Sequence, residues 1–361
     1  MTFLRNAWYM FGWRDELPEG GMLARTVLDE PIVVYRNVET GSLVALHDRC
    51  PHRFAPLSRG RLEGTEIRCG YHGLKFDCEG ACTENPFNRG AIPRAAKVRS
   101  FPVVEAPGTI WVWTGDPHGA DVALIPDIAY HADPAMRYVK GVTTVASDYR
   151  LLSDNLMDLT HATFLHPAFG GWEYMPRFRS EERPDGSVVS DYTIDDMVNI
   201  YEGMIEAERI RVRDTIRWIA PSTHLLDSYG GLRGEEDWQV YVPSAHILTP
   251  ETATSTHYFW SSGVEKDSPM PDEELHAILQ AAFDTEDKPM VEAVQSRMQG
   301  KDLFELDPVL LPTDAGGIRM RRKLAALIAA EQAHEGPPVA AARPVPDKVT
   351  ISSCCGTTSR H

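Results

Sequence analysis

The sequence lacks any long hydrophobic run. No apolar segment among its 361 residues approaches the ~20 residues that a membrane-spanning helix needs. Its first residues, MTFLRNAWYMFGW, also lack the apolar core of a secretory signal peptide. We therefore expect a soluble, cytoplasmic protein with no membrane partner.

Basic residues are scarce relative to acidic ones. Lys and Arg total 36 against 52 Asp and Glu, which gives a formal net charge of −16. Nucleic acids and anionic membranes attract basic surfaces, so this balance argues against either as a partner. Residues 1–118 hold 14 basic and 14 acidic side chains, so the whole negative charge lies in residues 119–361. This step predicts a domain boundary near residue 118.

Cysteines are also few, and disulfides are rare in proteins that lack a secretory signal. We interpret them as reduced thiols or metal ligands. The six positions are Cys50, Cys69, Cys78, Cys82, Cys354 and Cys355.

The pattern along the chain predicts two domains and a tail. Residues 1–118 have short β-branched and aromatic runs between turns, which indicates an all-β domain. Residues 119–335 mix helical and strand patterns, and residues 336–361 are rich in Pro and Ala and then polar, which is typical of a flexible tail. The expected strands are 31–36, 43–46, 109–113, 188–217 (more than one strand) and 254–260, and the expected helices are 151–165, 273–298 (interrupted at Pro289) and 314–333.

Four soft metal ligands lie close together in the first domain. Cys50, His52, Cys69 and His72 form the pattern C-x-H-x16-C-x2-H. In a Rieske [2Fe–2S] cluster, two cysteines hold one iron and two histidines hold the other. A Cys2His2 zinc site is the alternative, but zinc usually pairs cysteine with cysteine and histidine with histidine at short spacing. The spacing therefore favours the iron–sulfur cluster.

The residues around these ligands carry a family resemblance. The segments Cys50-Pro-His-Arg-Phe-Ala-Pro-Leu-Ser-Arg-Gly60 and Cys69-Gly-Tyr-His-Gly-Leu-Lys-Phe-Asp77 resemble the two cluster loops of Rieske non-heme iron oxygenases. The resemblance implies an α+β protein. Its parts would be an N-terminal all-β Rieske [2Fe–2S] domain and a C-terminal α+β, helix-grip-like catalytic domain with mononuclear Fe(II).

A second metal site is suggested by Asp158, His161 and His166. Two histidines five residues apart point about 140° apart on a regular helix, at ~100° per residue. Pro167 disfavours helical geometry at His166 and lets that imidazole swing back. Two histidines and a carboxylate leave positions open for O2 on Fe(II). Taken alone, such a histidine pair is more often structural.

The family pattern N-x2-D-x2-H-x4-H stands here as Asn155, Asp158, His161 and His166. The resemblance implies that both histidines bind the iron and that an acid on a late helix is the third ligand. The best match is Asp287, with Asp284 and Glu286 as rivals in the same acidic run.

The resemblance also implies a role for Asp158 and an oligomeric state. In these enzymes the cluster and the iron of one subunit are too far apart for useful electron transfer. Head-to-tail homotrimers bring one subunit's cluster beside the next subunit's iron. We therefore predict that the carboxylate of Asp158 bridges His161 to His72 of a neighbouring subunit.

Three further segments resemble the vanillate O-demethylase and dicamba monooxygenase branch: 3–9, 246–252 and 314–319. This implies oxidative O- or N-dealkylation of a small aromatic compound with O2. A ring-hydroxylating dioxygenase and a Rieske electron-transfer protein are the alternatives. The sequence has no GxGxxG nucleotide motif or flavin motif, so we expect electrons from a separate reductase, a ferredoxin, or both.

The substrate pocket is the least specified part of the sequence. His246 matches a pocket histidine of the dicamba enzyme, although a solvent-facing histidine is equally compatible with the strand pattern. Leu226 and Ile278 stand where that enzyme has polar and aromatic pocket residues. We expect these three to contact substrate, in a pocket that suits a neutral aromatic ether or N-alkyl anilide as readily as an aromatic acid.

The cluster loops carry a local excess of basic residues. Between Arg49 and Lys75 there are six basic residues and two acidic ones, Glu63 and Glu66. We therefore predict a basic rim that steers an acidic redox partner to the cluster.

Overall fold

The computed structural model describes residues 3–169 and 176–333, which form two compact units. One unit contains residues 5–125, and the other contains residues 3–4 and the described residues from 126 onward. The division falls a few residues beyond the boundary expected at residue 118. The expected tail, 336–361, lies outside the described residues.

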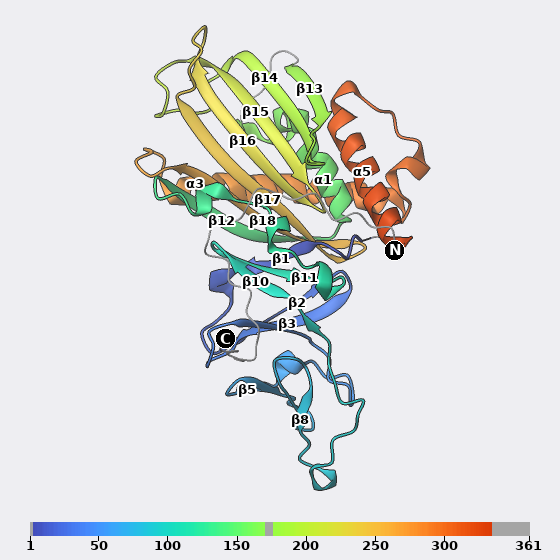
Figure 1. The fold of residues 1–361 in the computed structure, drawn as a ribbon. Coiled ribbons are helices and arrows are strands. Elements are labelled where there is room, and N and C mark those ends of the chain that lie inside the picture. The colour runs from blue at the N-terminus through green and yellow to red at the C-terminus, as the bar shows by residue number, and fades with distance from the viewer. Residues whose placement is uncertain (1–2, 170–175, 334–361) are drawn as a thin grey trace. The chain divides into compact units, whose positions relative to one another are not determined.

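The first unit is all-β apart from short 3-10 turns (Figure 1). Its strands form three antiparallel sheets, in the orders β1-β11-β10, β2-β3-β4-β9 and β5-β6-β7-β8. The strands are β1 Trp8–Trp13, β2 Met22–Val27, β3 Glu30–Arg36, β4 Leu43–His47, β5 Arg61–Glu63, β6 Glu66–Arg68, β7 Lys75–Phe76, β8 Cys82–Glu84, β9 Ser100–Phe101, β10 Val103–Ala106 and β11 Thr109–Trp113. The 3-10 helices are Arg14–Glu16, Leu57–Arg59, Asn88–Gly90, Pro117–Gly119 and Val122–Leu124.

The strands expected in this unit are confirmed as β3, β4 and β11. Their β-branched and aromatic residues fit a pleated, buried surface, and every residue of β11 is buried. The third sheet has a different function, because β6 ends immediately before Cys69 and β7 begins three residues after His72. It therefore holds both ends of the second cluster loop.

The second unit is built on one seven-stranded antiparallel sheet with the order β12-β18-β17-β16-β15-β14-β13. Its strands are β12 Met136–Val145, β13 Arg177–Glu182, β14 Val188–Val198, β15 Arg209–Ile219, β16 Thr223–Leu232, β17 Val240–Thr252 and β18 Ser255–Glu265. Its α-helices are α1 Tyr149–Met157, α2 Ala162–Leu165, α3 Asp272–Gln280, α4 Lys288–Met298 and α5 Ala315–Gln332, with a π-helical segment, Ala281–Asp287, between α3 and α4. Its 3-10 helices are Ala129–His131, Leu159–His161, Pro167–Phe169, Leu303–Leu306 and Pro312–Asp314. In the described part of the chain, no helix is long and apolar enough to cross a membrane.

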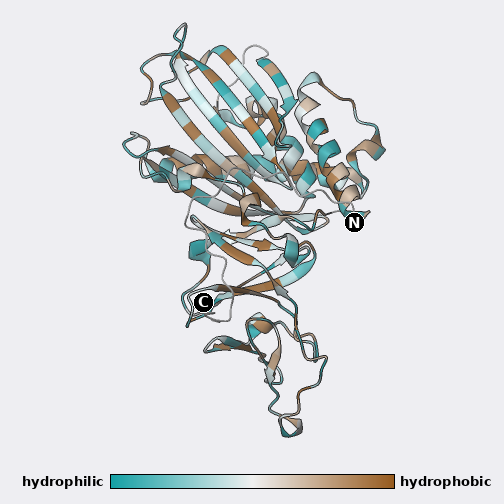
Figure 2. Ribbon diagram, viewed as in Figure 1, coloured by the Kyte–Doolittle hydropathy of each residue, from teal (hydrophilic) through white to brown (hydrophobic). Residues whose placement is uncertain are grey.

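The sheet contains strands that the sequence pattern did not predict. β14, β15 and β18 were expected, whereas β12, β13, β16 and β17 were not. β17 contains Pro243 and Pro250, and proline usually argues against a central strand. β16 contains the pair Gly230-Gly231, which has a turn-like composition. Figure 2 shows that hydrophilic and hydrophobic residues are mixed along these strands. One face of the strands lines a cavity and is not packed as a dry core.

Of the three helices expected in this unit, the one over residues 314–333 is confirmed as α5 and the other two are interrupted. The one expected over residues 151–165 breaks at Asp158, whose backbone (φ −120°, ψ 93°) is extended. The one expected over residues 273–298 widens into the π segment just before Pro289. Proline cannot donate to the carbonyl four residues earlier, and its ring displaces that carbonyl, which favours such a wide turn. Each interruption lies beside a predicted metal ligand.

A buried ion pair joins α1 to α5. Arg321 is 6% exposed and makes a bidentate contact with Asp154, with Nη2 2.6 Å and Nε 2.8 Å from Oδ2. Figure 1 shows the two helices side by side. This pair fixes the helix that leads to the predicted iron histidines.

We expect Asp154→Ala to lower the free energy of unfolding by about 3 kcal/mol, because Arg321 is then buried with only its 3.8 Å contact to Asp302. Denaturant unfolding followed by tryptophan fluorescence measures this loss. The control is Asp195→Ala, which breaks an exposed ion pair in which the Asp195 side chain is 67% exposed and that of Arg177 72%. Its loss should lower the free energy of unfolding by under ~1 kcal/mol. Equal losses in the two variants would contradict a structural role for the buried pair.

Candidate active site

The break at Asp158 sets the position of the first histidine. Asp158 ends α1 and begins the 3-10 helix Leu159–His161, where its Oδ1 accepts hydrogen bonds from the backbone N–H and the hydroxyl of Thr160 at 3.0 and 2.6 Å. Its Oδ2 accepts one from the Thr313 hydroxyl at 3.1 Å. The chain therefore changes direction between α1 and His161.

The expected hydrogen bond between the Asp158 carboxylate and His161 is replaced by another one. His161 Nδ1 bonds to the main-chain carbonyl oxygen of Asp158, while both carboxylate oxygens accept from threonines. The reason is the break in the helix: Asp158 caps the following turn, and capping directs its side chain to the N–H of Thr160. The predicted contact is thus made through the backbone of the same residue.

His166 leaves the helix as Pro167 requires. It ends α2 with φ −115° and ψ 87°, outside the helical region. Its side chain is 3% exposed, and its Nδ1 lies 2.7 Å from Glu286 Oε2. A histidine that uses one ring nitrogen for a carboxylate presents the other nitrogen in a fixed direction.

Asp287, at the end of the π segment, is the acid that meets both histidines. Its Oδ1 lies 3.6 Å from His161 Nε2 and 3.3 Å from His166 Nε2, and it accepts a hydrogen bond from Asn155 Nδ2 at 3.0 Å. The rival Asp284 points elsewhere, to the hydroxyl of Thr143. The rival Glu286 contacts His166 on its opposite nitrogen, as described above.

The electrostatics of the two histidines differ. Burial lowers the pKa of His161, and the nearby Asp287 only partly offsets this, so the imidazole is neutral. Burial also lowers the pKa of His166, but hydrogen bonds to Asp287 and Glu286 outweigh it and leave the pKa raised. A divalent metal bound between these imidazoles and the Asp287 carboxylate would take the place of a shared proton.

These three residues fit a mononuclear iron. One ligand atom from each of His161, His166 and Asp287 lies within 4.8 Å of the others. Both histidines have their second nitrogen held, one by a carbonyl and one by a carboxylate, which is how metal-binding histidines are oriented. Two imidazoles and one carboxylate are the donor set of Fe(II) oxygenases, with coordination positions left open.

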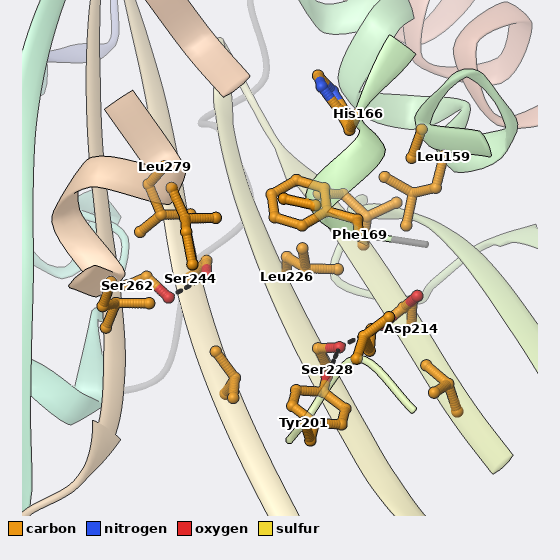
Figure 3. A pocket seen from close by; sticks show the side chains of 18 of the residues that line it. Leu159, His166, Phe169, Tyr201, Asp214, Leu226, Ser228, Ser244, Ser262 and Leu279 are labelled. Carbon is orange, nitrogen blue, oxygen red and sulfur yellow. Dashed lines mark hydrogen bonds between the residues drawn. The ribbon is translucent and has the colours of Figure 1, made fainter. Parts of the chain in front are cut away.

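A largely apolar cavity opens beside the three residues, with about 1270 Å³ of space that includes its mouth (Figure 3). Its wall comes from strands β15 to β18, from α3 and from the turns around His161 and Phe169. The three residues predicted to contact substrate, Leu226, Ile278 and His246, all line it.

His246 is held as a neutral imidazole. Its Nδ1 lies 2.7 Å from the Tyr258 hydroxyl, and its Nε2 is buried without a hydrogen-bond partner among the described residues. Burial lowers the pKa of His246 to about 4 and raises that of Tyr258 well above 10, so both groups are uncharged near neutral pH. A buried polar atom without a partner in a cavity wall is available to a ligand.

Sequence reasoning missed a polar cluster in the same cavity, formed by Asp214, Ser228 and Tyr201. A signal for it was present. On β15 the inward positions Ile210, Val212, Ile216 and Trp218 are apolar and buried, and Asp214 interrupts that alternation.

The other predicted ligands come together in the first unit. Cys50 and Cys69 are each 2% exposed, whereas His52 is exposed and His72 is half-buried. The two imidazole rings have their centroids 4.4 Å apart. Two inner thiols and two outer imidazoles form a donor set that fits a Rieske cluster.

The two cluster loops repeat the same turn. Four residues after each cysteine, the backbone N–H of Phe54 or Gly73 donates to the carbonyl of Cys50 or Cys69, at 2.9 and 3.1 Å. Both turn residues have positive φ, 60° and 75°. This conformation suits glycine and is unusual for phenylalanine.

The loops also approach each other closely. A Cβ on Gly60 would lie 1.9 Å from the carbonyl oxygen of Arg68, and a Cβ on Gly70 would lie 2.7 Å from that of Arg59. Glycine at 60 and 70 therefore permits the contact that brings the two pairs of ligands together.

Three of the six basic residues of the predicted rim, Arg61, Arg68 and Lys75, are paired with acids. Arg68 pairs with Glu63 and Glu84, and Lys75 pairs with Glu66 and Glu84. Glu84, on β8, lies outside the stretch counted in the sequence and reaches the loops through the sheet. The predicted excess of basic charge is therefore smaller in the folded unit.

The comparisons with known proteins divide the chain in the same two parts. Residues 7–102 match the family described as Rieske [2Fe-2S] domain, and residues 145–330 match the family described as vanillate O-demethylase oxygenase C-terminal domain. The catalytic unit therefore has the α+β fold of that second family, next to a β-sheet Rieske unit.

Similar full-length proteins are known. Dicamba O-demethylase, oxygenase component, of Stenotrophomonas maltophilia is 39% identical, over 90% of this chain and 97% of that protein. Chloroacetanilide N-alkylformylase, oxygenase component, of Rhizorhabdus wittichii is 35% identical, over 91% of this chain and 97% of that protein. A crystal structure of dicamba monooxygenase with non-heme iron and dicamba is 38% identical, with a TM-score of 0.78, and covers 92% of this chain and 100% of that one.

These matches establish the class and its cofactors. The protein is an oxidoreductase that uses a Rieske [2Fe–2S] cluster and a mononuclear iron, and it acts as the oxygenase component of a system with separate electron-transfer proteins. The chain belongs to the Rieske non-heme iron oxygenases, in the branch that contains vanillate O-demethylase and dicamba monooxygenase.

Proposed function

We propose that this protein removes an alkyl group from an oxygen or nitrogen atom of a small aromatic compound, using O2. The observation that carries the proposal is the apolar cavity that opens directly onto His161, His166 and Asp287. The names of its relatives, an O-demethylase and an N-alkylformylase, point to the same type of reaction.

In this proposal each ligand has a specific role. His161 Nε2, His166 Nε2 and Asp287 Oδ1 hold Fe(II), and Cys50, Cys69, His52 and His72 hold the cluster. Bound iron supplies O2 activation with electrons from the cluster. Asn155 donates to Asp287 and Glu286 accepts from His166, so these two residues orient the iron ligands.

The overall reaction balances with an external reductant. One oxygen atom enters a C–H bond of the alkyl carbon, and the second leaves as water with two electrons and two protons. The resulting hemiacetal or hemiaminal then breaks its bond to oxygen or nitrogen and releases an aldehyde and the dealkylated aromatic. A separate reductase, a ferredoxin, or both supply the electrons in the cytoplasm.

The cavity walls hold the aromatic ring in this proposal. Leu226 and Ile278 present apolar surface to it, and His246 Nε2 offers a polar contact. An aromatic ring bound against these walls would exclude water from the space around the alkyl carbon.

We also propose that electrons reach the iron between subunits of a homotrimer. Asp158 is the residue through which they pass, because its carbonyl contacts His161 and its carboxylate is held in place by Thr160 and Thr313. Its partner in the adjacent subunit would be that subunit's His72.

The reaction itself is tested by supplying purified holoenzyme with a ferredoxin–reductase pair, NADH, O2 and a panel of methoxy- and N-methyl-substituted aromatics. We expect formaldehyde in a one-to-one ratio with the demethylated product for at least one substrate, measured by derivatisation and chromatography. Coupled O2 uptake without any aldehyde, or a cis-diol product, would overturn dealkylation and favour ring hydroxylation.

The choice of the third iron ligand predicts a change in metal content. Asp287→Ala should reduce bound iron from about three to about two atoms per chain, because only the cluster irons remain. Elemental analysis measures the iron, and the visible spectrum shows whether the cluster is intact. Asp284→Ala is the matched control, since that acid bonds to Thr143, and it should keep the third iron. Loss of iron in the control alone would reverse the assignment.

Asp158→Ala should keep both metal centres and lower turnover by about 10- to 100-fold, because the contact between subunits is lost while the carbonyl that holds His161 stays. Iron analysis, the cluster spectrum and NADH-driven turnover measure this. Thr313→Val removes one hydrogen bond to the carboxylate but keeps the two from Thr160, so it should lose much less activity. Turnover of the Asp158 variant within about twofold of wild type would exclude the proposed role.

A further inference from the structure

The cavity also carries a carboxylate, on the sheet and away from His166. Figure 3 shows Asp214 there with Ser228 and Tyr201, and Leu226 and Phe169 between this cluster and His166. Asp214 comes from β15 and Ser228 from the adjacent β16, where the two residues are direct partners in the strand register.

The hydrogen bonds of this cluster run in one direction. The Ser228 hydroxyl donates to Asp214 Oδ1, so its single hydrogen is used. The Tyr201 hydroxyl, 2.6 Å from Ser228 Oγ, is therefore the donor in that second contact. The chain of donors ends on Asp214, whose remaining lone pairs can accept further hydrogen bonds.

No described residue that lines the cavity is a lysine or arginine, so no cation neutralises Asp214 there. Residues 170–175, which lie outside the described part of the chain, also include no lysine or arginine. Arg213 points to the other face of the sheet, where it binds Asp191. Burial raises the pKa of Asp214 to about 6, so the carboxylate is still ionised in neutral solution without a counter-charge.

The register places this carboxylate well away from His246. Asp214 and Ser228 form one row across the sheet, and Trp218, His224 and His246 form another. Four residues along a strand separate these rows, or ~13 Å at 3.3 Å per residue. Along the sheet the cavity wall thus has the row of His246, then a row with Ile216, Leu226 and Ser244, and then the row of Asp214.

We propose that Asp214 is a specificity-determining residue that accepts a hydrogen bond from an ammonium, amide or hydroxyl group at the end of the substrate remote from the oxidised carbon. This inference rests on the proposed function and narrows its substrate class. It favours aromatic ethers and N-alkyl arenes that carry a remote donor group, and it disfavours those that carry a remote carboxylate, which Asp214 repels.

A purely structural role is the alternative. Asp214 would then serve to tie Tyr201, and the loop around it, to the sheet. Such a role predicts that loss of the carboxylate lowers stability equally with or without a ligand and leaves ligand preference unchanged.

Isothermal titration of the intact holoenzyme with three methyl ethers separates these roles. The probes are 2-(4-methoxyphenyl)ethylamine, 2-(4-methoxyphenyl)ethanol and (4-methoxyphenyl)acetate, which share one ring and differ at the remote group. Wild type should bind the amine and the alcohol at least about tenfold more tightly than the acetate, because a hydrogen bond to a charged group is involved. Asp214→Asn should weaken amine binding by about tenfold or more and reduce the preference over the acetate correspondingly.

Asp195→Asn is the matched control, because it removes a carboxylate of the same charge at an exposed position of β14 outside the cavity lining. It should leave the amine-to-acetate ratio within about twofold of wild type. An unchanged ratio in Asp214→Asn would overturn the inference. If that variant fails to fold, tighter binding of the acetate than of the amine by wild type would overturn it as well.

The proposed function is tested separately in the same samples. If binding follows Asp214 as expected but no probe or related ether yields formaldehyde, the dealkylation proposal fails and the recognition site stands. If formaldehyde is released but affinity does not depend on Asp214, the dealkylation proposal stands and the recognition site fails.

Discussion

The catalytic unit depends on one geometric requirement, that two histidines five residues apart face the same point. A regular helix directs such residues about 140° apart. The chain meets the requirement with two interruptions, an extended residue at Asp158 and an exit from the helix at His166 before proline. A third irregularity, the π segment, brings Asp287 to the same point. Regular secondary structure is given up wherever a ligand is positioned.

The long sheet provides the other half of the site. Its inward face lines the cavity, and the polar residues Asp214, Ser228 and His246 lie there among apolar ones. Polar groups in such positions normally cost stability. Their hydrogen bonds with one another and with Tyr201 and Tyr258 reduce that cost, and the atoms left without partners remain available to a ligand.

The cluster unit follows a different logic, because its ligands are local in the chain. Cys50 and His52 share one turn, Cys69 and His72 share another, and a short sheet holds the second turn at both ends. The close approach of the two turns then requires glycine at position 60. Short-range spacing is therefore enough to identify this site, although the four strands of the sheet that holds the second turn were not predicted.

The cluster ligands and the histidine pair could be predicted from the sequence, because each pair of ligands is close in the chain (50 and 52, 69 and 72, 161 and 166) and the family resemblance identified the second site. The fold settles which acid of the run faces both histidines: Asp287 contacts the Nε2 atoms of His161 and His166, whereas Glu286 contacts His166 at Nδ1. It also decided that Asp158 meets His161 through its carbonyl. The pairing of Asp214 with Ser228 comes from strand register, which joins residues far apart in the chain and leaves no local pattern to predict it.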